Sequence, residues 1–177
     1  DHTFLREWYA YDEQLTIGVN AVVADVTGDG REEVITAPQA GATPYIKLFS
    51  LSGDLLTPGW FVFSEDFRGG VNLATGDLTG DGVADLIVAQ ASSGQAWVKA
   101  YDLTKKEPRI ITEFLAYPET FAGGSYVATG DLTGDGRAEI ITGAGAGGGP
   151  QVRVFDQYGQ WTGLAFFPFP EAPLLSR

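Results

Sequence analysis

Short apolar runs return along the chain in a fixed order. Three of them begin at Gly18, Gly70 and Gly124 with the letters GVNAVVAD, GVNLATGD and GSYVATGD, and each ends at an aspartate. After a loop that contains two glycines, each is followed by a β-branched run, EVITA, DLIVA or EIITG. Because short runs of alternating or β-branched residues are typical of strands, each pair predicts a β-hairpin.

Two further runs complete the repeated unit. YIKLF, WVKAY and QVRVF alternate apolar residues with Lys or Arg, which predicts a third strand with one buried and one solvated face. A fourth strand carries an aromatic pair three residues apart, and a similar pair precedes the first full unit. The pairs are Trp60 with Phe63, Phe114 with Tyr117, Phe166 with Phe169, and Trp8 with Tyr11. We expect these rings to pack mainly between neighbouring sheets.

Four short antiparallel strands per unit of about 50 residues predict the blades of a β-propeller. The expected fold is all-β, with three complete four-stranded blades plus one extra N-terminal strand, open or completed by further chain or other copies. A β-sandwich or another β-solenoid is the alternative. The expected boundaries are 1–17 for the last strand of a preceding blade, 18–69 for blade 1, 70–123 for blade 2 and 124–177 for blade 3.

Composition narrows the classes of partner. The chain of 177 residues has a formal net charge of -12 and no clustered Lys or Arg, which disfavours a nucleic-acid partner. No apolar run approaches the ~20 residues of a membrane helix, so no membrane insertion is expected. The absence of Cys excludes disulfides and thiolate metal sites.

The acidity is concentrated in three nine-residue loops, DVTGDGREE, DLTGDGVAD and DLTGDGRAE, which begin at spacings of 52 and 54 residues. Without the nine acids at their first, fifth and ninth positions the net charge would be -3. Oxygen ligands at positions 1, 3, 5, 7 (by its carbonyl) and 9 suit Ca²⁺, which takes six to eight oxygens in flexible geometry. A glycine at position 6 permits the sharp turn around the ion. The predicted ligands, about one Ca²⁺ per loop, are Asp25, Thr27, Asp29, Arg31 and Glu33; Asp77, Thr79, Asp81, Val83 and Asp85; and Asp131, Thr133, Asp135, Arg137 and Glu139.

The spacing of these loops also has three other interpretations. An EF-hand is excluded because its position 12 would hold Thr36, Val88 or Thr142 in place of Glu. Mg²⁺ is disfavoured because it demands near-octahedral geometry and keeps its water. A metal-free turn held by Asp side chains on their own backbone remains open, although it leaves three carboxylates converging without a counter-ion. Thr at position 3 removes one possible charge and favours weak affinity, in the extracellular range.

The stretch FRGGVNLATGDLTGDGVADLIVA from Phe67, and the third copy FAGGSYVATGDLTGDGRAEIITG from Phe121, resemble the FG-GAP repeat of integrin α-subunit propellers and bacterial surface proteins. The resemblance extends over essentially the whole chain. It implies calcium bound by the loops at the rim of the propeller, and an extracellular or cell-surface location. Thr stands at position 3 where the family commonly has Asp or Asn, and Leu15 with Ile17 and Gly18 replaces the Phe and Gly-Gly before the first blade.

The sequence contains few residues or motifs that could support catalysis. The one histidine, His2, lies at the start of the chain, and no nucleophile motif is present. GAGAGG at 143–148 is followed by Pro150 and a predicted strand where a dinucleotide site needs a helix. We therefore expect a non-catalytic module for adhesion, binding or structural assembly, with a protein or glycan ligand. An accessory propeller domain of a secreted glycan-active enzyme is the alternative. Three blades fall short of a closed ring, so we expect further blades in the same chain or other copies as partners.

Overall fold

The computed structural model describes residues 6–168 of the chain. Over this range it contains twelve strands and no helix, and therefore no helix that could span a membrane. The strands are β1 (Val19–Ala24), β2 (Glu33–Pro38), β3 (Tyr45–Ser50), β4 (Trp60–Phe61), β5 (Val71–Gly76), β6 (Asp85–Gln90), β7 (Trp97–Asp102), β8 (Arg109–Leu115), β9 (Ser125–Gly130), β10 (Glu139–Ala144), β11 (Val152–Phe155) and β12 (Trp161–Phe166).

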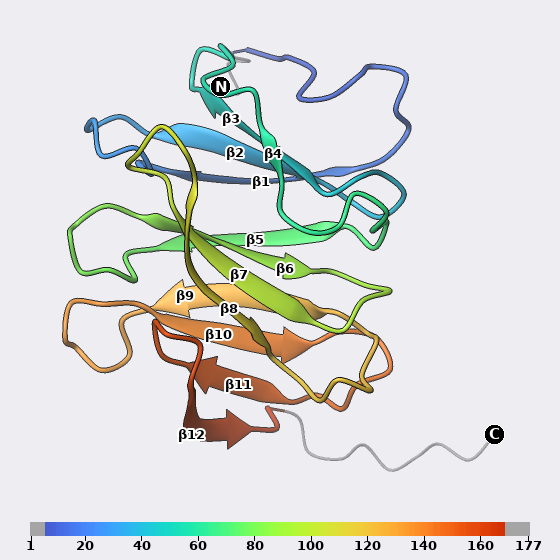
Figure 1. Cartoon of the computed structure of the whole chain (residues 1–177), viewed down its shortest axis with the longest axis vertical. Helices are drawn as coiled ribbons and strands as arrows, with labels where there is room; N and C mark the ends of the chain where they lie inside the picture. The colour runs from blue at the N-terminus through green and yellow to red at the C-terminus, as the bar shows by residue number, and fades with distance from the viewer. Residues whose placement is uncertain (1–5, 169–177) are drawn as a thin grey trace, which may run out of the picture.

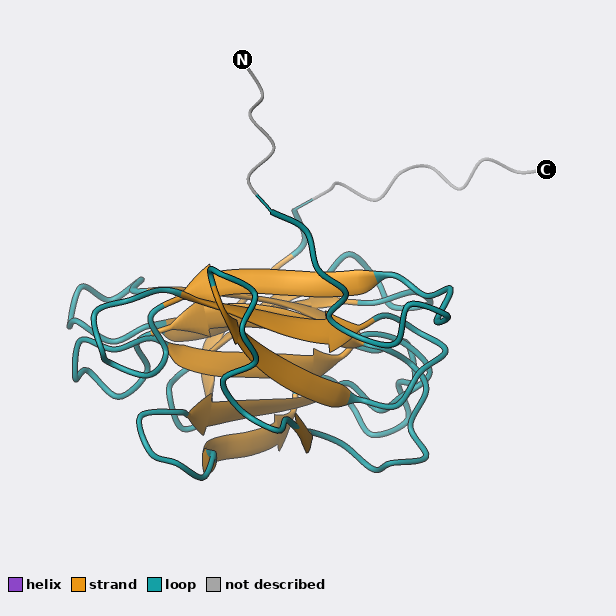
Figure 2. Ribbon diagram, turned by 90° about the horizontal axis from the view of Figure 1, so that it is seen from above, coloured by secondary structure: helices purple, strands orange, loops and turns teal. Residues whose placement is uncertain are grey.

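The strands form three four-stranded antiparallel sheets in chain order, β1 to β4, β5 to β8 and β9 to β12. The sheets stack along the long axis of the molecule (Figure 1), and loops gather at the two ends of the strands (Figure 2). Successive strands are joined by short connections, so each sheet is built from local pairings. This is the predicted arrangement of propeller blades, and over the described residues the stack is not closed into a ring.

Two hydrophobic clusters fill the spaces between the sheets, and β6 contributes to both. Leu86 and Val88 belong to the cluster between the first and second sheets, while Ile87 and Ala89 belong to the cluster between the second and third. All four side chains are fully buried. Because successive side chains of a strand point to opposite faces, a strand between two sheets must be apolar at every position. That requirement explains the unbroken apolar run LIVA at 86–89.

Over the described residues 6–17 the predicted N-terminal strand does not form, and residues 1–5, where the rest of it was expected, lie outside the described part of the chain. No described strand runs beside this segment to supply the ladder of hydrogen bonds that a strand needs. Its aromatic pair is nevertheless placed as the pattern predicts. Trp8 packs on Phe49 at 6.1 Å between ring centroids, as Trp60 packs on Tyr101 at 6.0 Å.

The second aromatic residue of each pair meets a cation from the third strand of the next sheet. The Lys47 ammonium lies 5.0 Å from the centre of the Tyr11 ring, and the Arg153 guanidinium 4.9 Å from that of Tyr117. Lys99 lies 5.7 Å from the Phe63 ring. The alternating Lys or Arg of the third strand therefore joins sheets by cation–π contacts, in addition to facing solvent. Phe169, the last residue of the predicted pairs, lies outside the described residues.

Candidate functional site

The three acidic loops connect β1 to β2, β5 to β6 and β9 to β10, and they lie one above another at the same side of the stack (Figure 1). Position 1 of each loop directly follows a strand, and position 9 is the first residue of the next one. The loops are therefore hairpin tips, as predicted. This placement fixes both ends of each loop on paired strands, and holds its first and last carboxylates close together.

The aspartate at position 1 organises each loop. In the first loop Asp25 accepts hydrogen bonds from the backbone N–H groups of Gly28 (2.7 Å) and Gly30 (2.9 Å). Asp77 and Asp131 accept the same two bonds in their loops. The backbone φ angles of Gly28 and Gly30 are +76° and +83°. Residues other than glycine rarely adopt such positive φ angles. The positive φ predicted for the glycine at position 6 is present, and position 4 needs glycine for the same reason.

The carboxylates at position 5 are exposed and accept few hydrogen bonds. Asp29, Asp81 and Asp135 each accept one bond, from the backbone N–H two residues later, at 2.9, 3.0 and 2.9 Å. Carboxylate oxygens have several lone pairs, so most of their acceptor capacity is free for another ligand.

The carboxylates at position 9 are buried. Glu33, Asp85 and Glu139 are only 3%, 3% and 4% exposed. Each accepts a hydrogen bond from the backbone N–H of position 2, at 3.1 Å from Val26, 2.8 Å from Leu78 and 2.7 Å from Leu132. One or two backbone donors do not replace the full hydration of a carboxylate, so each of these groups favours a nearby cation.

Burial raises the pKa of Glu33, although backbone hydrogen bonds from Val26 and Thr27 lower it, and the charges of Asp29 and Asp25 raise it further. Burial likewise raises the pKa of Asp85 to about 6, against hydrogen bonds from Leu78 and Thr79. In both loops the missing solvation is the largest cause.

The free energy of unfolding of the metal-free protein should depend on pH because Asp85 is buried. Between pH 4 and 6 the folded protein holds a proton on Asp85 that the unfolded chain has released, so the free energy of unfolding falls as pH rises through this window. Asp85→Asn keeps an acceptor oxygen and removes the titration. Relative to this variant, the wild type in chelator should lose on the order of 1–3 kcal/mol between pH 4 and 7, measured by urea unfolding. Parallel curves for the two proteins would contradict the prediction.

The first loop brings three carboxylates together. One oxygen from each of Asp25, Asp29 and Glu33 lies within 4.8 Å of the others. The Thr27 hydroxyl adds a further oxygen, 3.4 Å from Glu33. This all-oxygen donor set with three negative charges fits a hard divalent cation such as Ca²⁺ and could hold one. In residues 6–168 the corresponding acids of the second and third loops do not converge to the same distance.

Neighbouring loops are also joined through their backbones, a feature that the sequence pattern did not reveal. The N–H of Ala84 donates to the carbonyl of Asp25 at 3.2 Å, and the N–H of Ala138 donates to the carbonyl of Asp77 at 2.7 Å. Each bond links position 8 of one loop to position 1 of the loop before it. The three loops therefore form one hydrogen-bonded row. The carbonyls of Arg31, Val83 and Arg137 remain predicted ligands.

Among known protein families, a model of the FG-GAP-like repeat matches residues 25–88 and again residues 77–142. Each match begins at the first aspartate of an acidic loop, and together they cover two thirds of the chain. No curated protein sequence matches the chain.

The solved structures that are similar to it include two lyases. The crystal structure of exotype rhamnogalacturonan lyase YesX matches with a TM-score of 0.57 and 21% identity, over 81% of this chain and 29% of that one. The crystal structure of rhamnogalacturonan lyase YesW matches with a TM-score of 0.42 and 15% identity, over 82% of this chain and 42% of that one. The likeness to YesX shows a shared fold, and this chain spans less than a third of the length of that lyase.

Proposed function

Because the chain belongs to the FG-GAP-like repeat family, we propose that it is a non-catalytic, calcium-binding β-propeller module of an extracellular or cell-surface protein. The observation that carries the proposal is the convergence of the Asp25, Asp29 and Glu33 carboxylates in the first loop. In this proposal the module serves adhesion, binding or structural assembly.

Calcium has a structural role in this proposal. The ion would neutralise the buried carboxylate at position 9 and draw the exposed carboxylate at position 5 inward, so that each hairpin tip closes around it. The second and third loops have the same backbone hydrogen bonds as the first at positions 1 and 5. Their carboxylates at position 5 are exposed and accept a single bond, so these side chains are free to rotate toward an ion in the loop. We therefore propose about three Ca²⁺ ions, one per loop.

The non-catalytic assignment rests on the groups available. The chain has no Cys and only one histidine, His2. GAGAGG at 143–148 begins in β10 and leads into β11, a β-connection without the helix that binds a pyrophosphate. The described carboxylates with raised pKa values, Glu33 and Asp85, belong to the loops proposed to bind metal.

A second candidate is an accessory propeller domain of a secreted glycan-active enzyme. The fold likeness to rhamnogalacturonan lyase YesX, of which this chain matches 29%, favours it, because the match shows the same fold inside a longer enzyme chain. Calcium would have the same structural role in both candidates. They differ in what the module is attached to.

Calcium stoichiometry tests the proposal directly. Asp81→Ala removes an exposed carboxylate whose only hydrogen bond within the described residues is to the N–H of Val83. Isothermal titration should show the number of bound Ca²⁺ ions falling from about three to about two, because the second loop loses its ligand at position 5. The metal-free variant should be as stable as the wild type, since removing one of several crowded carboxylates also relieves repulsion.

Asp66→Ala is the matched control, because it removes one exposed negative charge outside the loops. It should leave the stoichiometry unchanged. Equal stoichiometry for the Asp81→Ala variant and the wild type would refute calcium binding by the second loop.

A further inference from the structure

The peptide group between positions 7 and 8 of an acidic loop contacts the loop before it. In the second loop this group joins Val83 to Ala84, and its N–H donates to the Asp25 carbonyl at 3.2 Å. In the third loop the N–H of Ala138 donates in the same way to the Asp77 carbonyl at 2.7 Å. The carbonyl of the same peptide group is the backbone ligand predicted at position 7. One rigid group therefore connects the predicted ligand of one loop to the backbone of its neighbour.

The planarity of this peptide group fixes the direction of its carbonyl. All described peptide bonds are trans, so the C=O and the N–H of one group point in opposite directions. Because the Ala84 N–H points toward the first loop, the Val83 carbonyl points away from that loop. The carbonyls of Val83 and Arg137 accept no backbone hydrogen bond within residues 6–168, so they are free to bind a cation.

The side chain at position 7 also contacts the loop before it. A Cβ atom added to Gly28 would lie 3.1 Å from Cγ2 of Val83, and one added to Gly80 would lie 3.0 Å from Nε of Arg137. These glycines occupy position 4 of the first and second loops, where their N–H groups bind the carboxylate at position 1. Position 7 of one loop therefore packs on the turn that holds position 1 of the loop before it.

Position 8 is anchored where another sheet precedes the loop. Ala138 is buried in the cluster between the second and third sheets, and Ala84 packs against the cluster between the first and second. The first loop has the exposed Glu32 at this position, and the Glu32 N–H has no backbone acceptor in the described part of the chain. The second loop is therefore joined to both of its neighbours, and no such bond joins the first loop to the third within residues 6–168.

We propose that the carbonyl at position 1 of one loop positions the carbonyl ligand at position 7 of the next, so that neighbouring loops bind Ca²⁺ cooperatively. Asp25 has this role for Val83, and Asp77 has it for Arg137. A carbonyl that coordinates a cation makes the N–H of its own peptide group a stronger donor, so filling one loop strengthens the bond to its neighbour. The coupling is reciprocal, whichever loop is filled first. The inference rests on the proposed function, because it concerns how the proposed sites act on one another.

Repulsion between bound ions opposes this coupling. Packed sheets lie about 10 Å apart, and at that separation in water two divalent ions weaken each other's binding roughly 15-fold. In 1 M salt the Debye length is about 3 Å, which removes nearly all of this repulsion. Titrations in 1 M KCl therefore isolate the contribution of the peptide groups.

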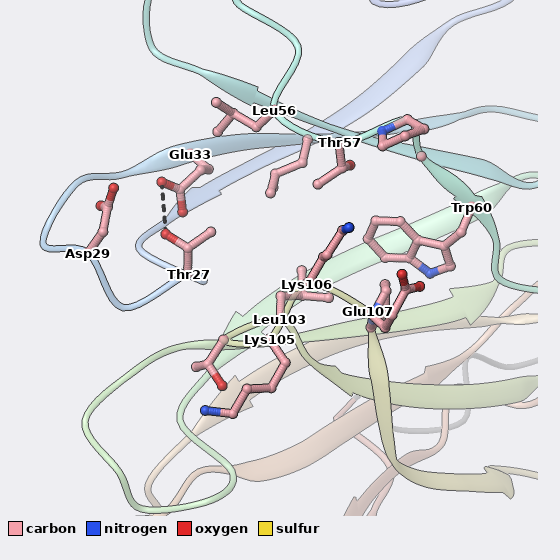
Figure 3. A pocket seen from close by; sticks show the side chains of 15 residues that line it. Thr27, Asp29, Glu33, Leu56, Thr57, Trp60, Leu103, Lys105, Lys106 and Glu107 are labelled. Carbon is pink, nitrogen blue, oxygen red and sulfur yellow. Dashed lines mark hydrogen bonds between the residues drawn. The ribbon is translucent and has the colours of Figure 1, made fainter.

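A cavity of about 560 Å³ separates the first loop from residues 103–108 of the β7–β8 hairpin (Figure 3). It opens because β4 has two residues, whereas β8 of the next sheet has seven. Asp29 and Glu33 line one side of the cavity, and Lys105 and Lys106 line the other. The two ammonium groups form no ion pair with a described residue, so their charge weakens cation binding by the first loop. This effect is present whether the second loop is filled or empty, so it cancels when the same loop is compared with and without its neighbour.

The test compares pairs of loops with single loops by isothermal titration of the whole chain with CaCl₂ in 1 M KCl. Asp29→Ala, Asp81→Ala and Asp135→Ala each disable one loop at position 5 and leave two, and the three double variants leave one. For two neighbouring loops, the product of the two association constants should exceed the product of the two single-loop constants about fivefold, at the lower end of known couplings. For the first and third loops, which remain in the Asp81→Ala variant, the two products should be equal. This pair is the matched control, because it has the same type of substitution and the same number of sites.

An excess in both neighbouring pairs, and none in the pair of first and third loops, supports the proposal. Equal products in the neighbouring pairs, or the same excess in all three pairs, would overturn the coupling and leave the three calcium sites in place. A wild-type protein that binds no Ca²⁺ would instead refute the proposed function, and the coupling with it. The three substituted aspartates are exposed, and circular dichroism of each metal-free variant checks that it is folded.

Discussion

Calcium is expected to raise the melting temperature of the protein by about 8–16 °C over that in chelator. At a tenfold excess over its dissociation constant each bound ion adds roughly 1.4 kcal/mol, so three ions add about 4 kcal/mol. For a chain of this size 1 kcal/mol corresponds to a shift of about 2–4 °C. The physical source is the buried carboxylate of each loop, Glu33, Asp85 or Glu139, which is 3–4% exposed and gains a counter-ion.

Circular dichroism melts in millimolar calcium, in magnesium and in chelator measure this shift. Magnesium should give a much smaller rise, because it retains its water and demands a regular octahedron. A melting temperature that is the same in calcium and in chelator would rule out calcium as a structural ion in these loops. The metal-free turn, in which the aspartates only bind their own backbone, would then be the correct interpretation.

The second large effect is expected at the centre of the stack. Ile87→Ala should lower the free energy of unfolding by about 2–5 kcal/mol, because it removes a fully buried side chain and leaves a cavity. Ile87 pairs with Ala74 on β5 and Ala100 on β7, and these small neighbours limit how far the site can be refilled. Urea unfolding in chelator measures the change without a contribution from the ion.

Ile110→Ala is the control, because Ile110 lies in β8 of the same sheet and is 50% exposed. This substitution should lower the free energy of unfolding by less than about 1 kcal/mol, because little buried apolar area is lost. Equal costs at the two positions would mean that the second sheet does not lie between two packed interfaces in solution.

The site was predictable from the sequence to the extent that it is local. The acidic positions, the glycines and the flanking strands all lie within nine residues and their neighbours, so spacing alone placed Asp25, Asp29 and Glu33 in one loop. Local spacing did not show that position 9 is buried in all three loops, because burial depends on the sheet stacked against it. The hydrogen bonds from Ala84 to Asp25 and from Ala138 to Asp77 likewise join residues about 60 positions apart and have no mark in the sequence.

The predicted N-terminal strand does not form over residues 6–17 for a related reason. The aromatic pair Trp8 and Tyr11 correctly predicted packing against the next sheet, where the Tyr11 hydroxyl donates to the carbonyls of Thr36 and Tyr45 at 3.0 and 2.7 Å. Side-chain packing needs only the neighbouring sheet. A strand also needs a paired backbone at its side, and the described residues supply none for 6–17.

The sequence by itself determined the all-β class, the four-strand unit, its repetition and the acidic hairpin tips, because alternation, turn residues and loop spacing act over a few residues and are repeated three times. Only the tertiary structure decided which side chains lie between sheets and how the loops are joined in a row. It also decided that the shortness of β4 opens a cavity beside Thr57 and Trp60. These features depend on surfaces that come from different sheets, and no local pattern records how two such surfaces meet.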